Sequence, residues 1–237
     1  PNNKATSTEG IRRQQQELCD ILDRLKEANF NTVMLQTRLR GDLIYPSTIE
    51  TFPEALTGKT GKNPGYDPLA FAIEECHKRG IELHAWIVTI PAGNNRQVKF
   101  LGKHSVVKKY RQICKQHDRA WFLDPGHPKT ADYLSNIVRE IVTKYDVDGI
   151  HFDDYFYPSG GTTEGSSAPD YDTYKASGTT LSMGDWRRAN VNQMVKDVYE
   201  AIQATRPDVR FGISPAGVSS MSASKYGLKT PSSYGVS

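Results

Sequence analysis

The chain has 237 residues, of which 37% are hydrophobic and 24% charged, and its formal net charge is +3. This balance is typical of a globular protein with one sizeable core, and it excludes a disordered or low-complexity chain. No long apolar run is present, so the sequence predicts no membrane span. The Lys and Arg side chains are scattered, except around Lys103 to Lys115, and they lack the interleaved aromatics of a nucleic-acid groove.

The three cysteines have no metal-like spacing, and their odd number argues against a disulfide framework. We therefore predict free thiols, no bound metal and no cofactor. The chain begins at Pro1 rather than at a Met, so we expect the N-terminus to have been processed or trimmed and a targeting segment to have been removed.

Helix and strand patterns alternate along the chain. Apolar residues at three- and four-residue spacing predict helices over residues 11–28, 129–145 and 186–204. Asp67 followed by Pro68 predicts the start of a further helix, which ends at Gly80. Short, largely apolar runs between these helices predict strands at 32–38, 81–88, 147–153 and 209–214.

The connections between these elements are asymmetric, because the loops after most strands are long and the returns from helix to strand are short. This is typical of a TIM-like (β/α)8 barrel, whose active face is built from the loops after the strands. A doubly wound sheet is the alternative, but no glycine-rich phosphate loop follows any strand. Four strands are fewer than a barrel needs, so either the chain is a segment of a longer protein or the pattern misses several strands. We favour the first and predict one incomplete barrel domain over residues 1–237. Residues 159–184, rich in Ser, Gly, Thr and Asp, are predicted to be one long loop, either a lid or a disordered insertion.

The strand at 147–153 presents the main chemical candidate. Alternation places Ile150 and Phe152 on one face, and His151 and Asp153 on the other. The apolar pair suits the helix layer, so we expect Asp153 to point inward at the rim of the barrel. A carboxylate there is costly to bury unless it is paired or used. An ion-pairing or helix-capping role is the alternative for Asp153, and the direction of Asp154 is left open.

Other strand ends should meet the same rim, and their side chains are predicted to contact the substrate: Gln36, Arg38, Asp42, Tyr45, His84, Trp86, Asp124, His151, Tyr155 and Tyr157. Arg38 would pair with a carboxylate or bind a substrate oxygen, with a surface salt bridge as the alternative. His84 beside Trp86 is typical of a sugar subsite, although a single strand histidine is usually structural.

Two other chemistries are less favoured. His84, His151, Asp153 and Asp154 are metal-ligand types, but their separations form no compact ligand motif. Ser214 lies in Gly-Ile-Ser-Pro-Ala-Gly, which is not a nucleophile elbow.

Several segments together resemble the bacterial glycosyl-hydrolase-like family ten: 31–38 with Gly41-Asp42, His84-Ala-Trp86, 122–126 with Tyr133-Leu134, Asp148-Gly-Ile-His-Phe-Asp-Asp-Tyr-Phe-Tyr-Pro158, and 212–217. The resemblance implies a β/α barrel distantly similar to α-amylase-type glycosidases. In those enzymes a Gly-x-x-x-Asp strand presents the nucleophile, a pattern that falls on Gly149 and Asp153. It also implies an exported bacterial protein, periplasmic or at the cell surface and often a lipoprotein, with some members linked to peptidoglycan glycan strands.

The chain departs from this family in extent. Members begin with a strand bearing an Arg and a Trp, which is absent before Pro1, and they continue with further strands after the region of Ser219. Leu39 stands where the family usually has Pro. We therefore expect part of the active site to lie outside this sequence, with an N-terminal strand and C-terminal strands missing.

The resulting prediction is a glycoside hydrolase that acts on an oligo- or polysaccharide. Such enzymes use two carboxyl groups. Asp153 is the predicted nucleophile or base, and its partner is left open between Asp154, Asp42, Asp124 and a Glu outside the chain. The alternatives are a non-catalytic carbohydrate-binding barrel, with Trp86, Tyr155 and Tyr157 as platforms, and a metal-dependent hydrolase. The sequence gives no basis for predicting whether the protein is a monomer or an oligomer.

Overall fold

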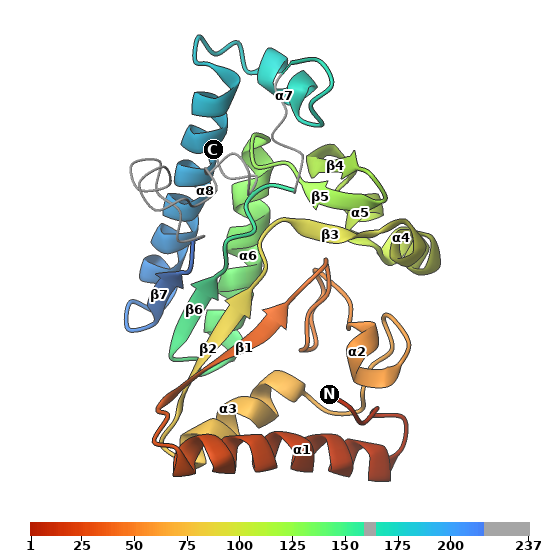
Figure 1. Ribbon diagram of the computed structural model, residues 1–237, viewed down its shortest axis with the longest axis vertical. Helices are drawn as coiled ribbons and strands as arrows, with labels where there is room; N and C mark the ends of the chain where they lie inside the picture. The colour runs from red at the N-terminus through yellow and green to blue at the C-terminus, as the bar shows by residue number, and fades with distance from the viewer. Residues whose placement is uncertain (159–164, 216–237) are drawn as a thin grey trace, which may run out of the picture.

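The computed structural model describes residues 1–158 and 165–215. Its main sheet is parallel and has the strand order β1-β2-β6-β7 (Figure 1). These strands are β1 (Thr32–Arg38), β2 (Glu82–Ile87), β6 (Gly149–Phe152) and β7 (Arg210–Ile213). The four strands predicted from the sequence are therefore confirmed, with small differences at their ends.

Four helices pack around this sheet: α1 (Thr8–Glu27), α3 (Pro68–Lys78), α6 (Pro128–Lys144) and α8 (Met183–Thr205). Their first turns have side-chain caps, because the N–H groups of a first turn lack helical partners. Asp67 accepts hydrogen bonds from two such N–H groups of α3, and Pro68 occupies the first helical position. α8 begins before the predicted Trp186, because Ser182 accepts a hydrogen bond from the Asp185 N–H.

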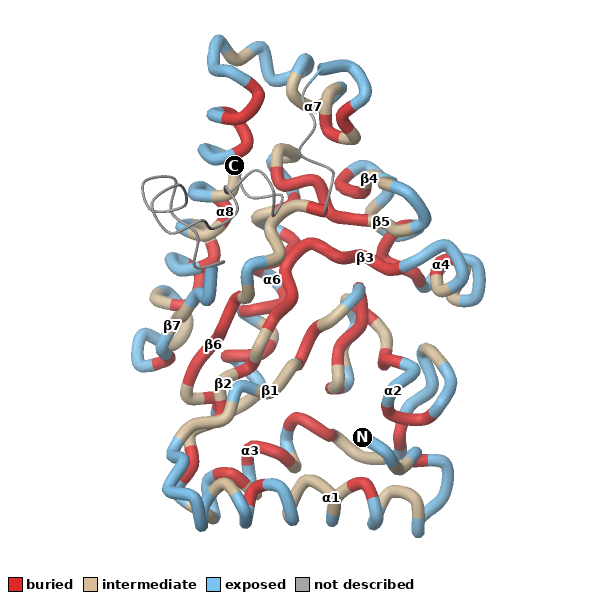
Figure 2. The backbone as a smooth tube through the Cα atoms, viewed as in Figure 1, coloured by how far each residue is buried: buried red, intermediate tan, exposed pale blue. Residues whose placement is uncertain are grey.

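The core lies between one face of the sheet and the helices (Figure 2). Burial alternates along β2, where Leu83, Ala85 and Ile87 are fully buried and His84 and Trp86 are partly exposed. α3 packs against β2, α1 against α3, and α6 against α8. The face that bears His84 and Trp86 is therefore the one turned away from the helices.

The sheet has two open edges in the described part of the chain, at β1 and β7. Apolar side chains are exposed on these edge strands, with Met34 50% and Ile213 36% exposed. The predicted parallel α/β sheet is confirmed. A closed barrel has eight strands, and the residues that the structure describes contribute four to the parallel sheet. Within the same residues, no helix combines the length and apolar character of a membrane span.

A second sheet, of antiparallel strands ordered β3-β5-β4, follows β2. Its strands are β3 (Pro91–Asn94), β4 (Cys114–His117) and β5 (Ala120–Leu123). Between β3 and β4 the chain forms α4 (Asn95–Leu101) and α5 (Val106–Lys109), with 3-10 turns at Gly102–His104 and Arg111–Ile113. A further short helix, α2 (Glu54–Thr57), follows β1. Sequence reasoning missed these strands, because each has four residues and shows too few alternations to register as a strand.

The segment predicted to be one long loop, 159–184, contains helix α7 (Tyr171–Ala176) and the first residues of α8. The prediction of one continuous loop is therefore wrong for residues 165–184, and residues 159–164 lie outside the described residues. A small apolar cluster of Ala168, Met183 and Trp186 holds the segment together. The fully buried ion pair between Arg187 and Asp170, with N···O of 2.6 Å, joins α8 to the start of α7.

Candidate functional site

Asp153 follows β6 directly, at the carboxyl end of a central strand, and is half-buried. Both oxygens of its carboxylate accept hydrogen bonds. The Trp86 Nε1–H donates to Oδ2 at 3.3 Å, and the backbone N–H of Tyr155 donates to Oδ1 at 3.1 Å. The carboxyl ends of parallel strands are where β/α enzymes place their catalytic groups. Asp153 is therefore a carboxylate of fixed orientation at the chemically active edge of the sheet.

The pKa of the Asp153 carboxyl is raised in this position. Burial raises the pKa of its carboxyl above the usual range, and the negative charge of Asp154 acts in the same direction. The hydrogen bonds from Tyr155 and Trp86 oppose this shift, because they stabilise the ionised form. Because its pKa is raised, the Asp153 carboxyl keeps its proton to a higher pH than an exposed Asp does, and such a shift suits acid–base chemistry.

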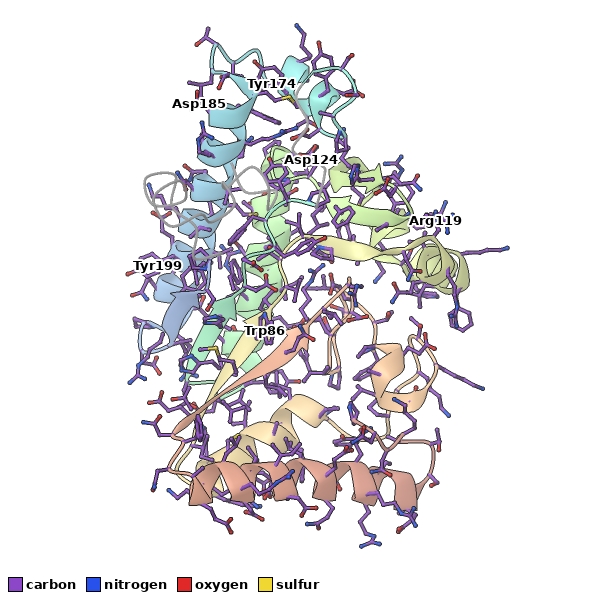
Figure 3. All side chains as sticks on the ribbon, viewed as in Figure 1. Trp86, Arg119, Asp124, Tyr174, Asp185 and Tyr199 are labelled. Carbon is purple, nitrogen blue, oxygen red and sulfur yellow. The ribbon has the colours of Figure 1, made fainter. Side chains whose placement is uncertain are left out.

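The strand register brings a row of side chains together on the face turned away from the helices. Gln36 of β1 pairs with Trp86 of β2, Trp86 with His151 of β6, and His151 with Gly212 of β7. Figure 3 shows Trp86 near the middle of this sheet. Trp86, His151 and Asp153 thus share one face, as strand alternation predicts, and the indole connects β2 to the Asp153 carboxylate.

Two glycines make room for the histidine rings on this face. A Cβ on Gly149 would lie 2.6 Å from Cγ and Nδ1 of His84, and a Cβ on Gly212 would lie 2.9 Å from Nδ1 of His151. Each imidazole therefore lies across the neighbouring strand, in space that any other residue would fill. Sequence reasoning noted Gly149 as part of the family pattern. The structure shows a steric reason for glycine here, because the His84 ring occupies the space that a side chain at position 149 would need.

His151 is hydrogen-bonded to a residue that the predicted set omitted. Its Nε2 lies 2.8 Å from Oγ of Ser214, directly after β7. Burial lowers the pKa of His151, as does the neighbouring His84, so the neutral imidazole is favoured. On the same face Nε2 of His84 is buried, 3.5 Å from Oε2 of Glu82, and no residue in the described part of the chain is hydrogen-bonded to it. The position of Ser214 at the carboxyl end of the predicted strand 209–214 was the available sequence signal.

Arg38 does not reach this face, so its prediction as a substrate-binding residue is corrected. Its guanidinium is fully buried and pairs with Glu50 at 2.7 Å, and Nη1 donates to the carbonyls of Val88 and Thr89 at 2.6 and 2.8 Å. Tyr133 of α6 donates to the same Glu50 carboxylate. Arg38 does pair with a carboxylate, as one predicted option held, but the pair fixes the ends of β1 and β2. No sequence signal singled out Glu50.

Tyr45 and Asp42 also lie away from Asp153. The Tyr45 hydroxyl donates to Oε2 of Glu140 on α6 at 3.0 Å, so the side chain points into the helix layer and its prediction as a substrate contact is corrected. Asp42 is buried beside an apolar cavity of about 510 Å³ at the free edge of β1, which Gln36 also lines. Burial raises the pKa of Asp42 to about 6, with the Glu50 charge adding to the effect.

Asp124 and Tyr157 belong to a second polar group, beneath α7 and the start of α8. Asp124 is buried and accepts hydrogen bonds from Thr173 Oγ1 and, at 2.9 Å, from the Gly126 N–H. The Tyr157 ring packs under the Arg187 guanidinium at 5.5 Å, and its buried hydroxyl has no hydrogen-bond partner among the residues that the structure describes. These contacts connect the predicted lid segment to the strand ends, and they occupy both oxygens of Asp124.

Tyr155 and Asp154 lie next to Asp153 and differ in exposure. The Tyr155 ring stacks on Phe122 of β5, with centroids 6.2 Å apart and planes 14° apart, so one ring face is covered. Asp154 is exposed, and no described residue is hydrogen-bonded to its carboxylate. Within the described chain, no group of three or more His, Cys, Asp or Glu side chains is arranged to share a metal ion.

Parallel βα units with an oriented carboxylate at a strand end and polar side chains beside it define an α/β protein of the kind from which β/α-barrel scaffolds are built. The comparisons with known proteins agree. The profile of the family described as glycosyl hydrolase-like 10 matches residues 3–230. The chain belongs to this family.

Curated relatives extend over most of the chain. It is 39% identical over 226 residues to the glycosyl hydrolase DigH of Escherichia coli K12, covering 91% of this chain and 51% of DigH. It is 38% identical over 224 residues to the glycosyl hydrolase YngK of Bacillus subtilis, covering 92% of this chain and 42% of YngK. The chain thus spans about half the length of the curated relatives it matches.

Solved glycosidases share the fold. An α-L-fucosidase of Paenibacillus thiaminolyticus matches 87% of this chain and 30% of its own, with a TM-score of 0.56 at 16% identity. The α-galactosidase AgaA of Geobacillus stearothermophilus matches 86% of this chain and 26% of its own, with a TM-score of 0.51 at 14% identity. At such identities the likeness concerns the fold alone, which is the TIM-barrel type of these glycosidases.

Proposed function

We propose that this chain supplies a catalytic carboxylate, Asp153, to a glycoside hydrolase that cleaves oligo- or polysaccharides. The observation that carries the proposal is the fixed orientation of Asp153 at the end of β6 by Trp86 and the Tyr155 N–H. Membership of a glycosyl hydrolase-like family and the names of the curated relatives support the same reaction class.

In this proposal Asp153 acts as nucleophile or general base. Its ionised form attacks the anomeric carbon or activates water, and a second carboxyl group protonates the leaving oxygen. The hydrogen bonds from Trp86 and Tyr155 keep the carboxylate in one orientation, which lowers the entropy that must be lost on the way to the transition state. His151, held to Ser214, lines the same face and is proposed to contact a sugar hydroxyl.

Asp154, next to Asp153, and Asp124, in the second polar group, are candidates for the second carboxyl group, and they differ in availability. Asp154 is exposed and its carboxylate is not hydrogen-bonded to any described residue, whereas the oxygens of Asp124 are bound by Thr173 and Gly126. We therefore favour Asp154 over Asp124 as the partner of Asp153 within this chain. A bacterial glycan, including the glycan strands of peptidoglycan, is the proposed substrate.

The test is digestion of a glycan panel, including peptide-free peptidoglycan strands, with the products identified by mass spectrometry. The full-length protein is assayed beside this segment, with Asp153→Asn as the isosteric variant and Asp124→Asn as the matched control. We expect Asp153→Asn to lose cleavage and Asp124→Asn to retain it. Wild-type cleavage by Asp153→Asn would refute the assignment. Glycan binding without any product from the wild-type protein would favour a non-catalytic carbohydrate-binding barrel.

A further inference from the structure

The antiparallel segment between β2 and α6, residues 91–123, has an unusual charge. It carries eight Lys and Arg side chains and a single acidic one, Asp118, which is a formal charge of +7. The whole chain carries +3, so all other residues together carry −4. This segment, called the basic insertion below, therefore concentrates positive charge in a molecule that is otherwise slightly acidic.

Most of this charge faces solvent. Seven of the basic side chains are exposed: Arg96, Lys99, Lys103, Lys108, Lys109, Arg111 and Arg119. The ion pairs from the insertion to acidic side chains elsewhere are long, 3.7 Å from Arg96 to Glu54 and 3.9 Å from Lys115 to Asp124. On helices α1 and α3, by contrast, basic side chains pair closely with acidic neighbours, as Arg79 does with Glu75 at 2.7 Å. The positive field of the insertion is therefore poorly neutralised within the described chain.

The insertion is attached to the segment that carries Asp153. Phe122 of β5 stacks on Tyr155, and the Thr89 hydroxyl donates to the Tyr155 carbonyl at 2.7 Å. The Leu123 N–H donates to the carbonyl of Ile90 at 2.7 Å, which anchors β5 beyond the end of β2. Figure 1 shows β3, β4, β5 and α4 beyond the ends of β1 and β2, and Figure 3 places Arg119 at the outer side of this layer. A polymer lying on the insertion would thus extend toward the proposed active site.

The insertion also has features that suit a saccharide better than a nucleic acid. Phe100 of α4 is 68% exposed and borders a groove of about 390 Å³ between α2 and α4, lined also by Lys59, Arg96 and the acidic Glu54. An exposed ring beside cationic side chains suits the apolar face of an acidic sugar. Single-stranded nucleic acids need successive aromatic platforms for their bases. Among the other aromatics of the insertion, Phe122 is buried and Tyr110 packs against Tyr133. Trp121 is covered by Arg111 at 4.9 Å and donates to Asn95 through Nε1.

We propose that the basic insertion binds a carboxylated polysaccharide and holds it beside the Asp153 rim. This inference rests on the proposed glycosidase function, because it names the chemical class of the polymer that the same site would receive. The attraction acts over roughly the Debye length, about 8 Å at physiological ionic strength, so it captures many chain conformations without fixing one. The substrate would then be selected by charge at the insertion and by shape at the strand ends.

The test measures binding separately from cleavage. A fluorescently labelled oligogalacturonate is titrated in an anisotropy assay with the full-length protein carrying Asp153→Asn, so that hydrolysis does not consume the probe. The methyl ester of the same oligosaccharide has no carboxylates and serves as the probe control. A single-stranded DNA of equal charge provides the competing polymer class. The titrations are repeated over a series of salt concentrations.

Two matched variants locate the binding surface. One replaces Lys99, Lys103, Lys108 and Arg119 by Gln, because these side chains are exposed and are not hydrogen-bonded to any residue that the structure describes. The control replaces Arg24, Lys26, Arg139 and Lys175, which are exposed on α1, α6 and α7 and lose the same charge. Circular dichroism melts establish that both variants are folded.

We expect the insertion variant to bind the oligogalacturonate about tenfold more weakly at low salt, the control variant to bind normally, and added salt to weaken the wild-type interaction. Equal binding of the methyl ester, or equal losses in both variants, would overturn the inference. Tighter binding of the DNA than of the oligogalacturonate would overturn it in favour of a nucleic-acid surface. Carboxylate-dependent binding by a protein that cleaves no glycan would refute the proposed hydrolase and leave the binding surface established.

Discussion

The contact between Gly149 and His84 allows a quantitative prediction. A Cβ at position 149 would lie 2.6 Å from two ring atoms of His84, where ordinary van der Waals contacts begin at 3.4 Å. Gly149 does not have a left-handed backbone conformation, so Gly149→Ala adds only this steric conflict. The His84 ring is largely buried, with 12% of the side chain exposed, and it has little room to move. Overpacking of this kind costs about 1–3 kcal/mol of unfolding free energy.

Two further variants separate this clash from a general effect of alanine in a strand. In a His84→Ala background the obstructing ring is gone, so Gly149→Ala should change the stability by less than about 0.5 kcal/mol. Gly212→Ala creates a milder conflict, with its Cβ 2.9 Å from Nδ1 of His151, and should cost less than Gly149→Ala. Urea unfolding followed by circular dichroism gives these values. An unchanged cost of Gly149→Ala in the His84→Ala background would refute the reasoning.

Three other predictions concern buried charges and the candidate site. Glu50→Ala should lower the unfolding free energy by about 3–5 kcal/mol, because it leaves the Arg38 guanidinium buried without its partner; a loss below about 1 kcal/mol in urea unfolding would contradict this. The pKa of Asp42 is raised to about 6, so the native state binds the extra proton and stability should fall as pH rises from about 4 to 6. Asp42→Asn should abolish this dependence and stabilise the protein at pH 7 by up to about 3 kcal/mol, measured as unfolding free energy across that range. Trp86→Phe removes a hydrogen bond that stabilises ionised Asp153, so the acidic limb of the pH–rate profile should move to higher pH by up to about one unit, and an unmoved limb would contradict the assignment.

The sequence predicted which side chains of the central strands share a face, because strand geometry has a fixed period of two. That period alone places Trp86 with His84 and Asp153 with His151. The same argument failed for Arg38, because the pairing of β1 with β2 shifts between Gln36 and Arg38. An irregularity of this kind changes which way later side chains point, and it leaves no mark in the pattern of apolar residues.

The basic insertion shows a second limit of sequence patterns. Its three strands have four residues each, and its helices have seven and four, so none is long enough to develop a clear period. Their stability comes from contacts between them and with the strand ends, such as the stacking of Phe122 on Tyr155. The concentration of Lys and Arg was visible in the sequence, but its position beside the candidate active site was not.

The sequence by itself determined the parallel βα order, the face of the sheet on which Asp153 lies, and the family, because these depend on local periodicity and on contiguous motifs. Only the tertiary structure decided which distant residues meet. In that structure Arg38 pairs with Glu50, and Tyr45 contacts Glu140 of the helix layer. The His84 ring lies against Gly149, and Ser214 is hydrogen-bonded to His151. Such contacts depend on how strands and helices pack across large sequence separations, and packing is set by the shapes of all partners together rather than by any one segment.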